Sequence, residues 1–83
     1  MMIPEQSRAA RALVGMTQPA LAYLAGVGLS SVVDFERSRR LVSPDVVAAL
    51  MKALEGAGVE FIDENGGGAG VRLRNPKSPP GRK

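Results

Sequence analysis

The sequence predicts a mainly α fold in which four short helices are followed by a short C-terminal β-hairpin. Apolar residues recur three and four positions apart through about the first 55 residues, which is the spacing of helices with one buried face. Serine, threonine, proline and glycine divide this stretch into four segments. The spacing changes to two in VEFI and VRLR, which favours strands. The 83 residues suit one small domain.

The first helix is expected at residues 4–14, where a proline occupies the first position and Gly15 follows the last. Proline is tolerated there because its missing N–H would have no partner, and glycine ends helices in the left-handed conformation. The second helix is expected at 18–25, because Thr17 can cap its N-terminus and Gly26 can end it.

The third helix is expected at residues 29–38, after a turn of only three residues. Val32 and Phe35 are three apart and would share its buried face. The fourth helix is expected at 44–56, with Ser43 as its N-cap and a wide apolar stripe along it.

The two predicted strands, 59–62 and 71–74, flank DENGGGAG, whose residues favour turns. Its triple glycine, 66–68, also invites a phosphate-loop interpretation, but the GxxxxGK[ST] pattern is absent and a hairpin loop is favoured. A lone hairpin is marginal in water, so it must pack on a helix or pair with another chain. We therefore divide the chain into a helical domain, 1–58, a hairpin, 59–74, and a disordered basic tail, 75–83.

Composition narrows the possible functions. The absence of cysteine and histidine removes disulfides, thiolate nucleophiles, imidazole bases and the usual zinc ligands. We predict no catalytic residue, no metal, no cofactor and no small-molecule effector, and therefore no enzyme. No apolar run reaches the length of a membrane span, and MMIPEQSR has no hydrophobic signal core, so we expect a cytoplasmic protein.

The formal net charge is +3, and the charged residues are unevenly distributed along the chain. Residues 1–43 carry +2, residues 44–65 carry −4 and residues 66–83 carry +5. Three of the arginines stand close together at the end of the third predicted helix. This layout suits a polyanion partner on one face of the protein.

The second and third predicted helices, joined by a glycine-containing turn, form a helix-turn-helix candidate. Over residues 4–55 the register resembles that of the phage-repressor and Cro type of protein, the XRE family. The residues that carry the resemblance are Arg11, Gly15, Thr17, Gln18, Leu21, Ala22, Gly26, Val27, Val32, Phe35, Glu36 and Arg39. The C-terminal hairpin resembles that of some small bacterial members.

The resemblance implies that the third helix lies in the major groove of DNA and reads bases with its N-terminal part. The base-reading positions are Leu29, Ser30, Ser31 and Asp34. For Asp34, acceptance of a hydrogen bond from a cytosine amino group and simple pairing with Arg37 both remain open.

Other residues are expected to contact phosphates, which fix register without reading sequence. By the same resemblance, Arg11 and Glu36 form a structural ion pair. Ser38 stands where the family commonly has glycine, so a left-handed conformation there would be mildly strained. The predicted phosphate-binding residues are Gln18, Val33, Arg37, Arg39 and Arg40.

The function that follows is a homodimeric, sequence-specific transcriptional regulator that binds an inverted-repeat operator in double-stranded DNA. The alternative is a protein-interaction module on the same scaffold, of the antitoxin or anti-activator type, with weak or secondary DNA binding. An exposed apolar patch around Leu29 and Val33 would favour this alternative. The side chains predicted to join the subunits are Leu54, Val59, Phe61, Val71 and Leu73.

Overall fold

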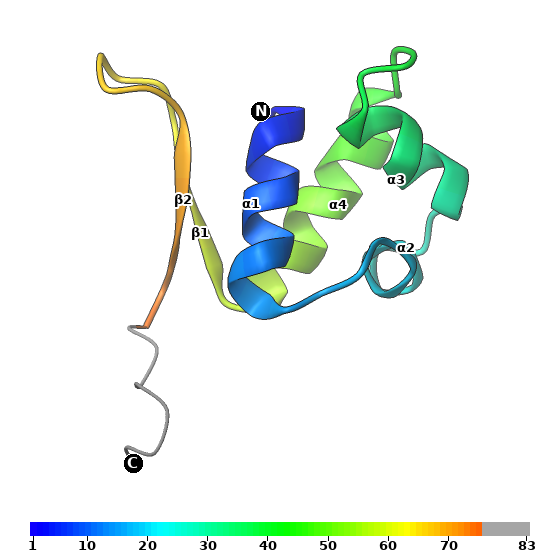
Figure 1. Ribbon diagram of the computed structural model, residues 1–83, viewed down its shortest axis with the longest axis horizontal. Helices are drawn as coiled ribbons and strands as arrows, with labels where there is room; N and C mark the ends of the chain where they lie inside the picture. Colours follow the sequence, from blue (N-terminus) through cyan, green and yellow to red (C-terminus); the bar gives the residue numbers. More distant parts are fainter. Residues whose placement is uncertain (76–83) are drawn as a thin grey trace.

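The computed structural model describes residues 1–75 and contains helices and a hairpin in the predicted order (Figure 1). The predicted fold class is confirmed. From residue 76 onward the predicted tail lies outside the described residues. The elements are α1 (Pro4–Val14), α2 (Gln18–Ala25), α3 (Leu29–Glu36), α4 (Pro44–Gly56), β1 (Val59–Ile62) and β2 (Gly70–Leu73).

The helices α1, α2 and α4 begin and end where the local sequence signals it. The Thr17 hydroxyl accepts a hydrogen bond from the amide of Ala20 at 3.1 Å and caps α2. The Ser43 hydroxyl accepts one from the amide of Val46 at 3.3 Å and caps α4. Gly26, with φ of +71°, ends α2 in the left-handed conformation that lets α3 start after a short turn.

The end of α3 differs from the prediction, because the helix stops at Glu36, two residues before the expected end at Ser38. Arg37 has φ of −97° and ψ of 0°, and Ser38 has φ of +55°. A left-handed residue cannot continue a right-handed helix. The chain therefore turns back on α3, and the amide of Arg39 donates to the carbonyl of Asp34 at 2.9 Å.

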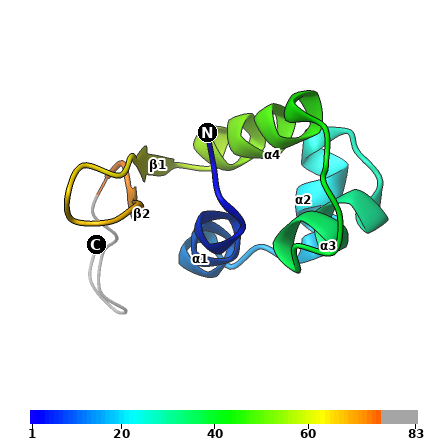
Figure 2. The same cartoon turned by 90° about the horizontal axis from the view of Figure 1, so that it is seen from above.

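One hydrophobic core holds the helices together. Leu21 of α2 and Val32 of α3 are fully buried, as are Leu50 and Leu54 of α4. The α2–α3 pair packs on α4, and α1 lies beside them (Figure 2). Among residues 1–75, the buried apolar residues are Met2, Ala10, Leu21, Ala22, Val32, Phe35, Val47, Leu50, Leu54 and Val59. This core fixes the angle at which α3 is presented.

The hairpin packs against α1 and α4, on the side away from α3 (Figures 1 and 2). Its strands are antiparallel, with Phe61 opposite Val71 and Ile62 opposite Gly70. β2 therefore covers residues 70–73, one position earlier than predicted. Among the helices of residues 1–75, none combines the length and the apolarity needed to cross a membrane.

Candidate nucleic-acid interface

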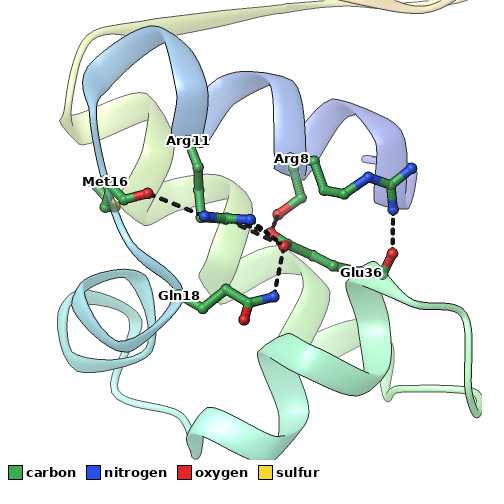
Figure 3. Close-up of polar contacts among 6 residues, drawn as sticks. Arg8, Arg11, Met16, Gln18 and Glu36 are labelled. Atoms are coloured by element: carbon green, nitrogen blue, oxygen red, sulfur yellow. Dashed lines mark hydrogen bonds and ion pairs between the residues drawn. The ribbon is translucent and has the colours of Figure 1, made fainter.

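The buried carboxylate of Glu36 ties the last residue of α3 to α1 and α2 (Figure 3). Its side chain is only 1% exposed. The Arg11 guanidinium donates to it from Nη2 at 2.7 Å and from Nε at 2.9 Å. The Ser7 hydroxyl donates at 2.6 Å and the Gln18 side-chain amide at 3.0 Å. Three helices thus meet at one charged group.

Burial alone would raise the pKa of the Glu36 carboxyl. The hydrogen bonds from Arg11, Ser7 and Gln18, together with the charge of Arg11, outweigh that effect and hold this pKa below its ordinary value. Glu36 is therefore ionised at neutral pH. A buried charge that is paired and fully hydrogen-bonded is tolerated, whereas an unpaired one is costly.

Two further arginine contacts reinforce the junction around Glu36. The Arg8 guanidinium donates to the backbone carbonyl of Glu36, which lies at the end of α3 where carbonyls lack helical partners. Arg11 also donates from Nη1 to the carbonyl of Met16 at 3.2 Å, and so holds the α1–α2 connection. Ser7 and Arg8 were not predicted as site residues. Their positions on α1 carry no local signal for a contact with residue 36.

α3 is buried on one side and open on the other. Val32 and Phe35 face the core. Leu29 is 46% exposed and Ser30 is also exposed, while Ser31 is half-buried. The N-terminal part of α3 thus presents three of the four residues that were predicted to read bases.

The fourth predicted base-reading residue, Asp34, is half-buried and pairs with Arg40. Arg40 Nε lies 2.7 Å from Asp34 Oδ2. The sequence had suggested Arg37 as the ion-pair partner of Asp34, and that suggestion was wrong. Because Ser38 reverses the chain after α3, residue 40 comes back alongside residue 34, while Arg37 remains exposed.

The residues predicted to bind phosphates fall into different surroundings. Arg37 and Arg39 are exposed, and no carboxylate of residues 1–75 lies within ion-pairing distance of them. Gln18 uses one side-chain N–H for Glu36, so it is not the free donor that was predicted. Val33 lies within α3, where its backbone N–H is used by the helix, so only van der Waals contact remains open to it.

The predicted dimer surface is largely used within the chain. Leu54 and Val59 are fully buried, which leaves nothing of them for a partner subunit. Phe61 and Val71 pack against the same core, and Leu73 is half-buried. The sequence left open whether the hairpin packs on a helix or pairs with a second chain. In the structure it packs on α1 and α4 of its own chain.

Comparison with known proteins supports this geometry. A family model described as a helix-turn-helix domain matches residues 6–61, which is more than half of the chain. No curated protein matches the sequence. The matched segment contains α1 apart from its first two residues, the α2–α3 corner, α4 and most of β1. The chain therefore belongs to the helix-turn-helix domain family, in agreement with its resemblance to XRE-type regulators, and this membership indicates DNA binding.

Proposed function

We propose that the protein is a sequence-specific transcriptional regulator that binds an inverted-repeat operator as a homodimer through the major groove. One observation carries the proposal. The exposed face of α3 is held in a fixed orientation by the Glu36 junction, and arginines follow immediately at its end. A rigid helix flanked by cations suits a groove lined by phosphates.

The residues proposed to read bases lie along the open side of α3. The Ser30 hydroxyl can donate to or accept from several base edges, and the Leu29 side chain can contact a thymine methyl group. Asp34 is paired with Arg40 through Oδ2, which lowers the cost of bringing a carboxylate near phosphates. Its second oxygen can accept from a cytosine amino group.

The proposed phosphate contacts come from both ends of the motif. Arg37 and Arg39 supply cations after α3. Gln18 opens α2, where backbone N–H groups and the helix dipole favour an anion. With one of its amide hydrogens on Glu36, Gln18 has the other for a phosphate oxygen.

Selection of bound duplexes from a random pool tests the proposal most directly. The expected product is a site with two-fold symmetry whose half-sites lie about 34 Å apart, or one helical turn. The same experiment returns the base preference at each position. Recovery of sequences without symmetry, or no enrichment at low salt, would contradict the proposal.

A pair of variants tests whether the residues proposed to contact phosphates and those proposed to contact bases have different effects on binding. Arg39→Ala is expected to weaken binding to every duplex and to reduce the salt slope by about one, because one phosphate contact is lost. Ser30→Ala is expected to leave the salt slope unchanged and to change the preferred sequence. Fluorescence anisotropy titrations at several salt concentrations measure both quantities.

Arg72→Ala is the matched control, because Arg72 is an exposed arginine on β2, on the far side of α1 from α3. It should change neither the salt slope nor the sequence preference. If Arg39→Ala and Ser30→Ala shift the same quantity, the assigned roles are wrong.

One observation favours the alternative of a protein-interaction module. Tyr23 and Leu24 at the end of α2 are 85% and 58% exposed, and Leu29 lies just beyond the turn. Exposed apolar side chains that lie together mark interaction surfaces. A stable protein partner, together with DNA affinity that does not depend on sequence, would establish this alternative in place of the regulator.

A further inference from the structure

Leu41 lies in the connection between α3 and α4 and is 98% exposed. Leu41 is one of the residues that line a groove of about 420 Å³. The α3–α4 connection lies at the end of the molecule where α1 begins (Figure 1). The groove is lined by Pro4, Phe35, Ser38, Arg40, Leu41 and Val42. A large apolar side chain in water and an apolar groove therefore lie next to each other on one surface.

We infer that Leu41 of each copy inserts into this groove of a second copy when two copies bind one operator. A two-fold interface uses the same patch on both subunits, so the patch must contain both the inserted side chain and its receptor. The α3–α4 connection meets this requirement. The inference rests on the proposed two-fold binding to DNA, and it names the surface that joins the subunits.

The position of this surface suits the spacing of an operator. α3 and the hairpin lie at opposite sides of a molecule that is 41 Å long (Figures 1 and 2). An end-to-end pair joined at the hairpins would hold its α3 helices much farther apart than the 34 Å between successive major grooves. The α3–α4 connection directly follows α3, so a two-fold axis beside it keeps the two α3 helices close together.

The charges around the groove are complementary across such an axis. Glu5 is exposed beside Pro4, and Asp45 is exposed in the first turn of α4, just after the groove. Arg40 is exposed, lines the groove itself and pairs with Asp34 of its own chain. Insertion of Leu41 into a partner's groove brings Arg40 toward these carboxylates of the partner, which favours that pairing over others.

The surface is small. Six residues line the groove, whereas a stable interface uses about 20–30 residues on each side. A contact of this size does not hold a dimer together in dilute solution. It acts when DNA holds two copies side by side at a high effective concentration, and it then appears as cooperative binding.

Replacement of Leu41 tests the inference on two duplexes, one with the full selected site and one with a single half-site. Leu41→Ser is expected to lower affinity for the full site by roughly ten- to a hundredfold, because each copy loses a leucine that so small a contact buries only in part. Affinity for the half-site should stay unchanged. Ala48→Ser, at an exposed apolar residue of α4 that does not line the groove, is the control and should leave both affinities unchanged.

A second measurement works without DNA. A benzoylphenylalanine photocrosslinker at position 41, irradiated at millimolar protein concentration, should give covalent dimers in which residue 41 is joined to the segments containing Pro4 or Phe35. Crosslinks to the hairpin, or full-site affinity unaffected by Leu41→Ser, would overturn the inference. Absence of DNA binding by the unaltered protein would refute the proposed function. The crosslinks would still show whether Leu41 contacts the groove of a second copy, because that experiment needs no DNA.

Discussion

Glu36 shows how one side chain can set the geometry of a binding surface. It lies at the end of α3, yet its hydrogen-bond donors come from α1 and from the first residue of α2. Because a buried carboxylate keeps its charge only if these donors stay in place, the three helices cannot shift independently. The energetic role of Glu36 is therefore to fix α3, and its contact with Gln18 extends this order to a residue that we propose contacts DNA phosphate.

Replacement of this carboxylate should be costly. Glu36→Gln is expected to lower the free energy of unfolding by about 3 kcal/mol, because it strands the largely buried guanidinium of Arg11 without a counter-charge. Urea unfolding followed by circular dichroism measures the change. Glu60→Gln, at an exposed pair with Arg72, is the control and should change stability by less than about 1 kcal/mol. Equal effects of the two substitutions would show that the Glu36 junction is not special.

The lowered pKa of Glu36 also predicts a dependence of stability on pH. Its folded-state pKa lies below that of the unfolded chain, which is about 4.3 for a glutamate. The stabilisation is therefore present above about pH 4.3 and is lost as pH falls through the lower pKa of the folded state. Unfolding midpoints measured from pH 7 downward should show this loss in the unaltered protein. In Glu36→Gln that component should be missing, and an unchanged acid profile would refute the assignment.

At the scale of elements, the end of α3 decides where the arginines lie. Ser38 adopts φ of +55°, and this residue reverses the chain so that Arg40 meets Asp34. A serine is strained in this conformation, whereas a glycine would not be. The chain accepts that cost at the boundary between the helix proposed to read bases and the segment proposed to clamp phosphates, where backbone strain is often retained.

This strain can be measured by substitution. Ser38→Gly is expected to raise the free energy of unfolding by roughly 0.5–1 kcal/mol, because relief of the left-handed strain exceeds the added flexibility of the unfolded chain. Ala48→Gly, at an exposed position inside α4, should instead lower it by about 1 kcal/mol. Thermal unfolding of both variants checks the two signs. Destabilisation by Ser38→Gly would mean that the serine side chain supports the turn.

At the scale of the whole molecule, the hairpin is joined to the helical part through α1. The buried side chain of Gln6 donates to the carbonyls of Ile62 at 3.2 Å and Gly70 at 2.9 Å. Its carbonyl oxygen accepts from the amide of Ile3 at 2.9 Å and so also closes the start of α1. At the opposite end of β1, Val59 is fully buried in the core. The hairpin therefore braces α1 from the side opposite α3.

Removal of the Gln6 hydrogen bonds should loosen the hairpin before the rest of the molecule. Gln6→Met keeps the volume but removes this donor from the partly buried carbonyls of Ile62 and Gly70, and is expected to cost about 1–2 kcal/mol. Hydrogen exchange should show faster opening of the β1 and β2 amides, with protection of α2 and α3 retained. Arg72→Met, which breaks only an exposed pair, should leave the hairpin protection unchanged. Uniform loss of protection in Gln6→Met would contradict a separate role for this junction.

Much of the fold follows from residues that act on their immediate neighbours. Thr17 and Ser43 cap the helices that follow them, and Gly26 takes the left-handed turn between α2 and α3. Each of these signals operates within a few residues, so it can be recognised in the sequence. The end of α3 was missed by two residues because a serine does not itself favour the left-handed conformation, although the resemblance had pointed to that conformation at Ser38. The exposure of Leu29 and Ser30 followed from the apolar spacing of α3.

The sequence by itself determined which segments are helices, where the hairpin forms and that a helix-turn-helix corner is present, because caps, glycines and apolar spacing are local properties. Only the tertiary structure decided which partners the polar and apolar side chains take. Gln18 meets Glu36, Asp34 meets Arg40, and the hairpin packs on its own α1 and α4. The physical reason is distance along the chain. Contacts such as those of Gln6 with Ile62 and Gly70 exist only after the core has set the helices and the hairpin at fixed positions.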